Sequence, residues 1–310
     1  MNSLMEKKII VVITYKTLYF FTRICCASVR YFYPDAEIYI VKDNLAGEFS
    51  TTEMEEALNV KVLDLGKDKY GWSAAKVHLL ASDKFQGQRV FSIDCDIVLA
   101  GRFLDDLYKK TEGADFVMDP DYKADITSKE FKGHYYTLDT IKEIDPGFEY
   151  PGYAFNGGQA IITTGKVTKE VLAPYFDVTT FPYYKRFDIF PQADQSLLNY
   201  ILPSLEQQGK IKITPVKFML WSDEAKTKTL ELEKIKEGTS YPYVIHWAGV
   251  LRVPYLDKMT RPDILHFFED YYYSKVPSGE AMKKARALLG IADFYLRNFY
   301  VKNIRPLIKK

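Results

Sequence analysis

The chain has 310 residues, of which 47% are hydrophobic, 27% are charged and 15% are aromatic. Its 42 lysine and arginine residues balance 41 acidic residues, and this formal net charge of +1 argues against a dedicated nucleic-acid binder. The hydrophobic content excludes a disordered chain, and three cysteines cannot form a disulfide scaffold. The sequence therefore predicts a globular protein of one or two domains in a reducing compartment, with no nucleic-acid partner.

Aromatic residues are the unusual feature of the composition, with 24 tyrosines and 20 phenylalanines. Tyrosine combines an apolar ring with a polar hydroxyl, so it suits both the boundary of a core and a ligand site. We expect most of these rings in a large aromatic core and only a few to stack on a sugar or a nucleobase.

The N-terminal region predicts a strand, a helix and a second strand. Residues 8–14 are, apart from Lys8, a continuous β-branched run, which is typical of a strand covered on both faces. Residues 17–33 have apolar side chains at helical spacing until Pro34 ends the helix, and 37–41 predict another short strand. This order predicts an α/β fold with a parallel or mixed sheet that binds ligands at the carboxyl ends of its strands.

The middle of the chain continues the alternation of strands and helices. A short helix is expected after residue 50 and a longer one from Trp72. Apolar runs predict further extended segments at 61–65, 89–93, 114–118, 160–163, 211–219 and 243–247, and a helix at 192–202. Another short apolar run lies at 97–99.

The segment 119–152 interrupts this pattern because it is mostly polar and aromatic. It contains Gly133, Gly147, Pro146 and Pro151, which favour turns. Loops of this length are usually functional or mobile, so we expect a long loop or lid over an acceptor.

The C-terminal segment 275–310 differs from the rest of the chain in charge. It carries nine basic and two acidic residues, a net charge of +7, whereas residues 1–274 carry 33 basic and 39 acidic residues, a net charge of −6. Apolar residues recur at spacings of three and four, at Ala281, Ala285, Leu288, Ala292, Tyr295 and Phe299. We expect one α/β domain over 1–274 and a basic amphipathic helical extension over 275–310, either packed on the domain or bound to an anionic membrane.

Hydropathy gives no membrane-spanning segment in the sequence. No apolar run approaches the roughly 18 to 20 residues that a span needs, and the early run 9–13 is too short for the core of a signal peptide. The sequence predicts a cytoplasmic protein, in which 275–310 either packs on the domain or contacts the inner face of a membrane peripherally.

Several enzyme signatures are missing from the sequence. There is no G-x-G-x-x-G, no Walker-type P-loop, no G-x-S-x-G, no H-E-x-x-H and no paired C-x-x-C. Dehydrogenases, P-loop enzymes, serine hydrolases and zinc fingers therefore lack their usual motifs, and carboxylates at strand ends remain as the candidates.

Asp94-Cys95-Asp96 is the strongest of these candidates because it follows the apolar strand 89–93. Residues two apart in an extended chain face the same side, so both carboxylates can face one ligand while Cys95 points away. Two close carboxylates repel each other unless a cation lies between them, so the pair predicts a site for Mn²⁺ or Mg²⁺. A solvated acidic pair is the alternative.

Three further residues can complete such a site. His246 ends the apolar run 243–245 and is either a structural histidine or a third metal ligand. Arg252, in the loop beyond it, suggests an anionic group beside the metal. Lys76 in the helix from Trp72 would add a second cation, or is an ordinary solvated helix residue.

Six segments in this order resemble the GT-A glycosyltransferases, most closely glycosyltransferase family 8. This retaining family includes glycogenin and bacterial lipopolysaccharide galactosyl- and glucosyltransferases. The resemblance covers nearly all of the chain before residue 275, and each motif is weak by itself. The segments are 11–15 with Tyr19, 72–76, 91–98, 155–158, 194–199 and 246–252.

The resemblance implies a fold and an activity. The fold would be the GT-A, Rossmann-like mixed sheet flanked by helices. The activity would be metal-dependent transfer of a hexose from a UDP-sugar to a hydroxyl of a glycan or glycolipid, with retention of configuration. Asp94, Asp96 and His246 would hold Mn²⁺ or Mg²⁺ against the donor diphosphate.

The resemblance also implies roles for other residues. Asp194 and Gln195 would line the reacting face of the sugar. Arg252 would bind diphosphate oxygens, and two glycines would let the backbone approach the sugar closely. The donor-binding residues would be Thr14, Tyr15, Tyr19, Lys76, Asn156, Gly157, Gly158, Gly249 and Arg252.

The sequence departs from the family pattern near its C-terminal motif. Arg252 stands where the family usually has lysine, and residues 253–254 are Val-Pro where it has Pro-Trp. Arginine keeps the positive charge and adds a second donor, so phosphate binding survives this change. The departure leaves a neighbouring GT-A family open.

Alternatives remain for the key carboxylate and for the function. Asp194 would be a nucleophile, a stabiliser or a sugar hydrogen-bond acceptor in a retaining enzyme, a general base in an inverting one, or merely a helix cap. A sugar-nucleotidyltransferase and an inactive nucleotide- or glycan-binding module are the rival functions. The presence of all three candidate metal ligands favours an enzyme over the inactive module.

Overall fold

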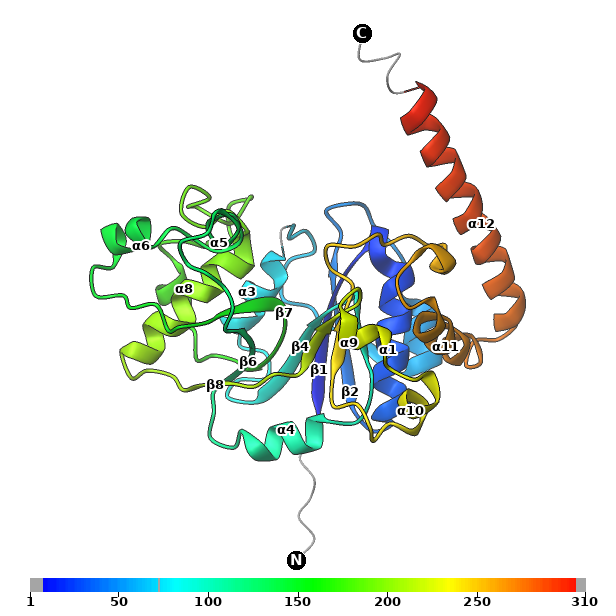
Figure 1. Ribbon diagram of the computed structural model, residues 1–310, viewed down its shortest axis with the longest axis horizontal. Coiled ribbons are helices and arrows are strands. Elements are labelled where there is room, and N and C mark those ends of the chain that lie inside the picture. Colours follow the sequence, from blue (N-terminus) through cyan, green and yellow to red (C-terminus); the bar gives the residue numbers. More distant parts are fainter. Residues whose placement is uncertain (1–7, 72, 305–310) are drawn as a thin grey trace, which may run out of the picture.

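The centre of the computed structural model, which describes residues 8–71 and 73–304, is a mixed sheet of seven strands in the order β3-β2-β1-β4-β7-β6-β8 (Figure 1). β7 is antiparallel to both of its neighbours, and the other pairs are parallel. The predicted α/β class and mixed sheet are therefore confirmed. The strands are β1 (Ile9–Tyr15), β2 (Glu37–Asp43), β3 (Val60–Val62), β4 (Arg89–Asp94), β6 (Phe116–Asp121), β7 (Ala154–Thr163) and β8 (Ile213–Pro215).

A second, three-stranded sheet continues from the end of β4. It has the order β5-β10-β9, with β5 at Ile97–Leu99, β10 at Val244–His246 and β9 at Met219–Trp221. β10 runs antiparallel to β5, and its register pairs His246 with Ile97. Because β5 begins directly after the Asp-Cys-Asp turn, this pairing brings the end of β10 next to that turn.

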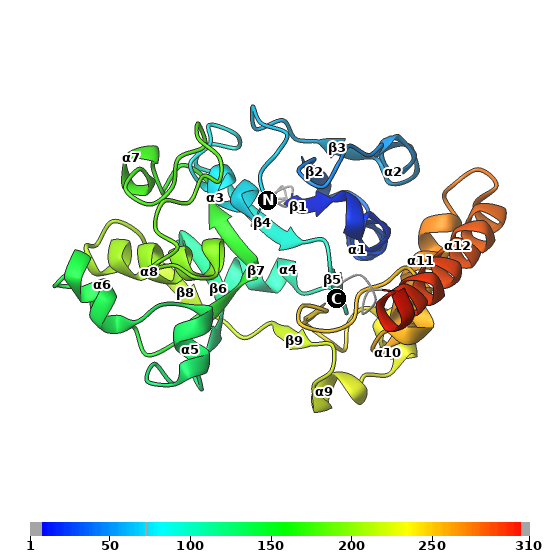
Figure 2. The ribbon, with the colours of Figure 1, turned by 90° about the horizontal axis from the view of Figure 1, so that it is seen from above.

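Helices cover both faces of the large sheet (Figure 2). α1 and α11 pack together on one face, and α3 and α8 pack together on the other. The helices are α1 (Tyr19–Phe32), α2 (Thr52–Leu58), α3 (Ala74–Leu80), α4 (Leu104–Lys110), α5 (Lys129–His134), α6 (Leu138–Ile144), α7 (Lys169–Leu172), α8 (Ala193–Gln207), α9 (Ala225–Lys228), α10 (Leu232–Glu237), α11 (Pro262–Tyr273) and α12 (Gly279–Phe299), with short turns at η1 (Lys16–Leu18), η2 (Leu256–Lys258) and η3 (Tyr300–Ile304).

The alternation of side chains in β1 explains why this strand is apolar throughout. Ile10 and Val12 face the core that contains α1, whereas Val11 and Ile13 face the core that contains α3 and α8. Since neither face meets water, the strand carries no polar alternation. Its carboxyl end lies at the same edge of the sheet as that of the parallel strand β4.

The segment 119–152 is not the open loop that its composition suggests. β6 continues to Asp121, and α5 and α6 follow it. Phe131, Tyr136, Ile141 and Phe148 are buried, with the ring centroids of Phe131 and Tyr136 5.5 Å apart. Several aromatic side chains of the segment thus form part of a core. The turn-forming residues between them give no sign of this packing.

The C-terminal segment contains the predicted helix as α12. Its residues 305–310, and Trp72 in the segment before α3, lie outside the described residues. No helix in the described part of the chain is long and apolar enough to cross a membrane.

Candidate active site

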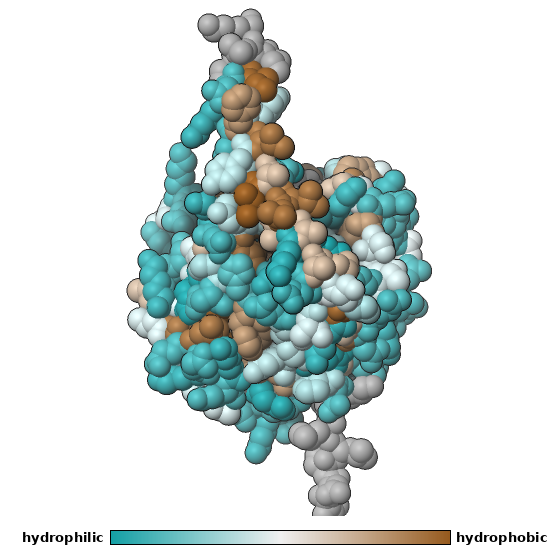
Figure 3. All heavy atoms as spheres, turned by 90° about the vertical axis from the view of Figure 1, so that its right-hand side faces the viewer, coloured by the Kyte–Doolittle hydropathy of each residue, from teal (hydrophilic) through white to brown (hydrophobic). Residues whose placement is uncertain are grey.

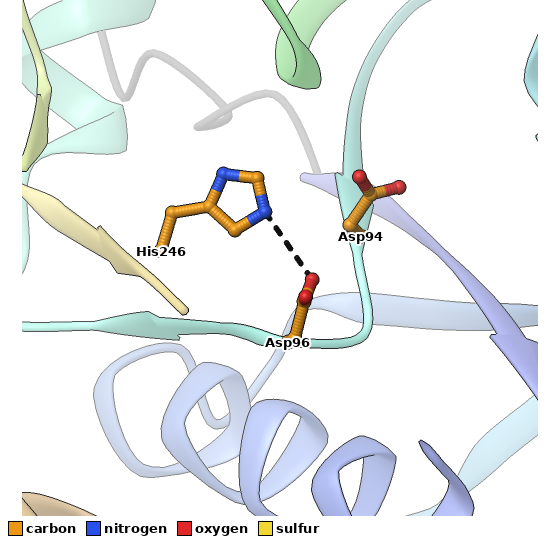
Figure 4. Close-up of side chains that lie close together, drawn as sticks. All are labelled: Asp94, Asp96 and His246. Atoms are coloured by element: carbon orange, nitrogen blue, oxygen red, sulfur yellow. Dashed lines mark ion pairs between the residues drawn. The ribbon is translucent and has the colours of Figure 1, made fainter. Parts of the chain in front are cut away.

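The turn between β4 and β5 carries the two predicted carboxylates. Asp94 is the last residue of β4, and Asp96 lies in the turn and is only 3% exposed. Cys95, between them, packs into the core that contains α1, so it points away as predicted. Figure 4 shows Asp96 and His246 pointing toward each other with Asp94 beside them.

Asp96 lies between two basic groups. His246 Nε2 is 3.3 Å from Asp96 Oδ1, and the Arg252 guanidinium donates to Asp96 Oδ2. Burial opposes the ionisation of Asp96, but His246 and Arg252 outweigh it and hold the pKa of that carboxyl well below its usual range. Asp96 is therefore anionic at neutral pH.

The donor set around this turn fits a divalent cation. Asp94, Asp96 and His246 each offer a ligand atom within 4.8 Å of the others. His246 Nε2 is buried and makes no hydrogen bond to a described residue beyond its 3.3 Å ion-pair contact with Asp96, which leaves it available to a cation. Two carboxylates and one imidazole match Mn²⁺ or Mg²⁺ better than a soft metal.

Gly158 makes room for this cluster. A Cβ atom built on it would lie 2.4 Å from His246 Cε1 and 3.0 Å from Asp94 Oδ2. Glycine is therefore required at this position of β7 by close approach, not by backbone conformation. The neighbouring Asn156 accepts a hydrogen bond from the Gly158 amide at 2.8 Å, which fixes the asparagine side chain beside the same cluster.

Lys76 is buried and is not a solvated helix residue. Its Nζ lies 2.9 Å from Asp94 Oδ1 and 3.0 Å from Asp194 Oδ2, and donates to the Gly157 carbonyl at 2.8 Å. Burial alone would lower the pKa of Lys76, but the two carboxylates raise it above its usual value. The ammonium thus joins β4, β7 and α8 at one point.

Asp194 lies in the first turn of α8, but it is not the helix cap. Gln192 occupies that position, and the Asp194 side chain reaches Lys76 instead. Burial raises the pKa of Asp194 to about 6, an effect that Lys76 partly offsets and Asp94 adds to. Asp194 is a buried carboxylate that can take or release a proton near neutral pH.

Gln195 and Asn199, also on α8, hold this helix to β7. Gln195 Oε1 accepts from Asn156 Nδ2 at 3.2 Å. Asn199 accepts from the Phe155 amide and donates to the Phe155 carbonyl, both at 2.9 Å. This paired bond fixes the start of β7 against α8, and with it the positions of Asn156 and Gln195.

A cavity of 410 Å³ opens beside the carboxylate turn. Asp43, at the carboxyl end of β2, shapes its rim by accepting hydrogen bonds from the amides of Leu45 and Tyr70, both at 2.9 Å, and of Gly71 at 2.7 Å. The lining residues are Ile13, Tyr15, Asp43, Leu45, Ala46, Gly71, Ser73, Asp94, Cys95, Asp96, His246, Ala248 and Arg252.

Thr14 and Tyr19 are among the predicted donor residues that do not line this cavity. The Thr14 hydroxyl is buried and lies 2.5 Å from that of Thr22 on α1. The Tyr19 ring packs 5.2 Å from that of Phe49, and its buried hydroxyl has no hydrogen-bond partner among the described residues. Tyr15, by contrast, lines the cavity.

A second cavity of 650 Å³ shares Ala248 with the first and continues toward α5. The Trp221 ring, at the end of β9, lies over the His246 ring with centroids 5.4 Å apart and planes 18° apart. The lining residues are Asp121, Lys123, Ala124, Asp125, Ser128, Glu130, Phe131, His134, Tyr135, Asn156, Gln192, Gln195, Trp221, Ala248 and Gly249.

The structure thus gathers most of the predicted residues and adds others. The three metal candidates, Lys76, Asp194 and Arg252 form one cluster, while Asn156, Gln195 and Gly249 line the adjoining cavity. Sequence reasoning missed Asp43 and Trp221. Both end a strand, which is the same signal that identified Asp94.

No protein-family model and no curated protein matches the sequence, but the structure resembles solved glycosyltransferases. The apo structure of the bifunctional glycosyltransferase WbbM has a TM-score of 0.59 at 12% identity, over 92% of this chain and 52% of WbbM. The galactosyltransferase LgtC, in complex with donor and acceptor sugar analogues, has a TM-score of 0.54 at 16% identity, over 88% of this chain and 99% of LgtC.

The chain has the fold of the GT-A glycosyltransferases. The resemblance that the six sequence segments predicted is confirmed at this level. The chain spans about half of the length of WbbM, so the likeness to that protein concerns one part of it.

Proposed function

We propose that this GT-A protein is a metal-dependent glycosyltransferase that moves a hexose from a UDP-sugar to a hydroxyl of a glycan or glycolipid. The observation that carries the proposal is the cluster of Asp94, Asp96 and His246, whose ligand atoms lie within 4.8 Å of one another at the wall of a 410 Å³ cavity. A nucleoside diphosphate bound there would bring its anionic oxygens to this cluster.

The residues of the first cavity suit such a donor. Asp94, Asp96 and His246 would hold Mn²⁺ or Mg²⁺, which when bound supplies Lewis-acid stabilisation of the leaving diphosphate. Arg252, one-third exposed, offers a planar guanidinium to phosphate oxygens. Tyr15 offers a ring at the cavity wall for the uracil base. Thr14 and Tyr19 would then support this end of the site from behind.

The buried charges of the site suit the sugar. Lys76 holds Asp194 in place, and Asp194 Oδ2 lies 3.4 Å from where a Cβ atom of Gly157 would be. Because Gly157 has no side chain, a sugar can approach Asp194 and Gln195 closely. An anionic Asp194 would stabilise the positive charge of an oxocarbenium-like transition state, and retention is the outcome we expect from the family resemblance.

The second cavity suits an acceptor sugar. It adjoins the first at Ala248, so an acceptor hydroxyl there would face the donor sugar. Trp221, 37% exposed, presents an aromatic surface at its wall, and the remaining lining is rich in hydrogen-bonding side chains. Polar groups around one aromatic platform are what recognition of a sugar requires.

Calorimetry of UDP binding tests the donor site. Wild type should bind UDP more tightly with Mn²⁺ than without it, and Asp96→Ala should lose that difference. Asp125→Ala, which removes an exposed carboxylate from the second cavity, is the matched control and should keep it. Equal Mn²⁺-dependent affinity in wild type and Asp96→Ala would refute the metal site.

A panel of sugar nucleotides distinguishes the transferase from its rivals. UDP release that needs both Mn²⁺ and an acceptor identifies a glycosyltransferase. Release of pyrophosphate from a nucleoside triphosphate and a sugar phosphate would instead identify a nucleotidyltransferase. Binding of UDP without any turnover across the panel would identify an inactive binding module.

A further inference from the structure

The helix α12 docks on the rest of the protein through one face. Gly290 is buried, and a Cβ atom there would lie 1.8 Å from the Pro254 carbonyl oxygen, so the helix approaches the backbone of that loop closely. Arg286 Nη1 and Nη2 each donate to a different oxygen of Glu53 at 2.7 Å. This bidentate pair and the glycine contact fix both the position and the rotation of the helix.

The opposite face of α12 is apolar and exposed. The apolar residues that recur at helical spacing in the sequence do not pack against the rest of the protein, because the helix docks through its other side. Figure 3 shows hydrophobic side chains gathered along the projecting helix. The exposed fractions are 68% for Leu288, 69% for Leu289, 56% for Tyr295, 68% for Leu296 and 58% for Phe299. A contiguous apolar face of this kind on a folded protein marks an interaction surface.

The surplus positive charge lies toward the end of this helix. Lys283, Lys284, Arg286 and Arg297 all pair with acidic side chains, so they contribute little net charge. Residues 300–310, in contrast, contain four basic residues and no acidic one. The segment therefore combines an apolar face with a basic end.

We propose that α12 and the residues after it bind the surface of an anionic phospholipid bilayer. The apolar face would enter the boundary between headgroups and acyl chains, and the basic end would meet anionic headgroups. Leucine with tyrosine and phenylalanine on one face is the composition that suits this boundary. A second copy of this chain fits less well, because the pairing of two apolar faces does not account for the four basic residues of 300–310.

Attachment to a bilayer bears on the class of acceptor. If the proposed transferase function holds, on which this step rests, an enzyme held at a bilayer through α12 suits an acceptor that is a lipid-linked glycan.

Vesicle flotation with the full chain tests the membrane contact without relying on activity. The probes are vesicles of phosphatidylcholine with phosphatidylglycerol and vesicles of phosphatidylcholine alone. The double variant Leu288→Ser, Leu296→Ser should bind the mixed vesicles about ten-fold less than wild type or more. Val62→Ser, at an exposed apolar position of β3, is the control and should bind like wild type.

Wild-type binding to mixed vesicles that falls in the double variant, and that weakens in high salt, supports the proposal. Equal binding by the double variant and wild type would overturn it, as would equal binding to both kinds of vesicle. Absence of vesicle binding together with a wild-type dimer that the double variant converts to a monomer in sedimentation would assign this face to a second copy instead.

Discussion

The two ends of the molecule use charge and apolar surface in opposite ways. At the carboxylate turn, Lys76, Asp96 and Asp194 are buried and matched with partners, while the apolar side chains around them are covered. On α12, the paired charges lie at the surface and Leu288 and Leu296 are exposed. Burial of charge is expensive, and so is exposure of a large apolar face. Each region therefore has a feature that lowers the stability of the fold, and folding alone does not explain why it is present.

The two regions also differ in whether their side chains already have partners within the protein. The buried charges of the site already have their protein partners in place. The helix face is incomplete without another surface. Substitutions should then affect the two regions very differently, and the differences are measurable.

Removing the buried lysine should have the largest effect on stability. Lys76→Met leaves the carboxylates of Asp94 and Asp194 without their common partner, at a cost of about 3–5 kcal/mol in the free energy of unfolding for a broken buried pair. Lys284→Met breaks an exposed pair on α12 and should change little. Urea unfolding of both variants measures the difference. Equal stabilities would mean that the charges at the turn are solvated.

Apolar substitutions test the same two regions in the opposite direction. Leu265 on α11 is fully buried, so Leu265→Ala should lower the free energy of unfolding by about 2–5 kcal/mol. Leu288 on α12 is 68% exposed, so Leu288→Ala should stay within about 0.5 kcal/mol of wild type. A large loss in Leu288→Ala by thermal or urea unfolding would show that this face is covered within the protein.

The close packing at Gly158 predicts an effect on the metal rather than on the fold as a whole. Gly158→Ala forces the His246 ring or the Asp94 carboxylate to move, and displacement of metal-site geometry typically costs 10–100-fold in affinity. Gly133→Ala on α5 is the control, because nothing lies within 4 Å of its added carbon. Titration with Mn²⁺ measures both affinities, and unchanged binding in Gly158→Ala would place the ion elsewhere.

Much of this arrangement could be predicted from the sequence, for a local reason. The apolar runs at 8–14 and 89–93 match β1 and β4, and the acids directly after the second run mark the site, because strand ends and functional groups coincide in such sheets. The burial of Lys76 could not be predicted, since its partner Asp194 is distant in sequence. For the same reason, nothing in residues 119–152 reveals that their aromatic rings pack into a core.

The helix α12 shows a second limit of sequence patterns. Its spacing of apolar residues correctly predicted an amphipathic helix but not which face meets the protein. The docking face is determined by two contacts. Gly290 packs against the loop that contains Pro254, and Arg286 pairs with Glu53 of α2. A periodic pattern gives the faces of a helix, whereas the tertiary partners decide which one is covered.

Turnover and vesicle binding should depend differently on pH, and this difference is the smallest of the expected effects. Lys76 and Asp94, together with Tyr184, are the ionisable groups around Asp194, whose pKa burial raises to about 6. If the anionic form of Asp194 serves the reaction, turnover is full above that pKa and falls as the pH drops through it, about ten-fold at one pH unit below. In Asp194→Asn, the residual turnover should lose this acidic limb.

Binding to the mixed vesicles should not follow the same curve. Lysine and arginine stay charged throughout this range, and the phosphodiester of the lipid does as well. Turnover measured with a soluble acceptor should therefore fall between pH 7 and pH 5 while vesicle flotation stays constant. Turnover that remains level down to pH 5 would exclude Asp194 as the group that must be ionised, and flotation that falls with it would mean that the two regions are coupled.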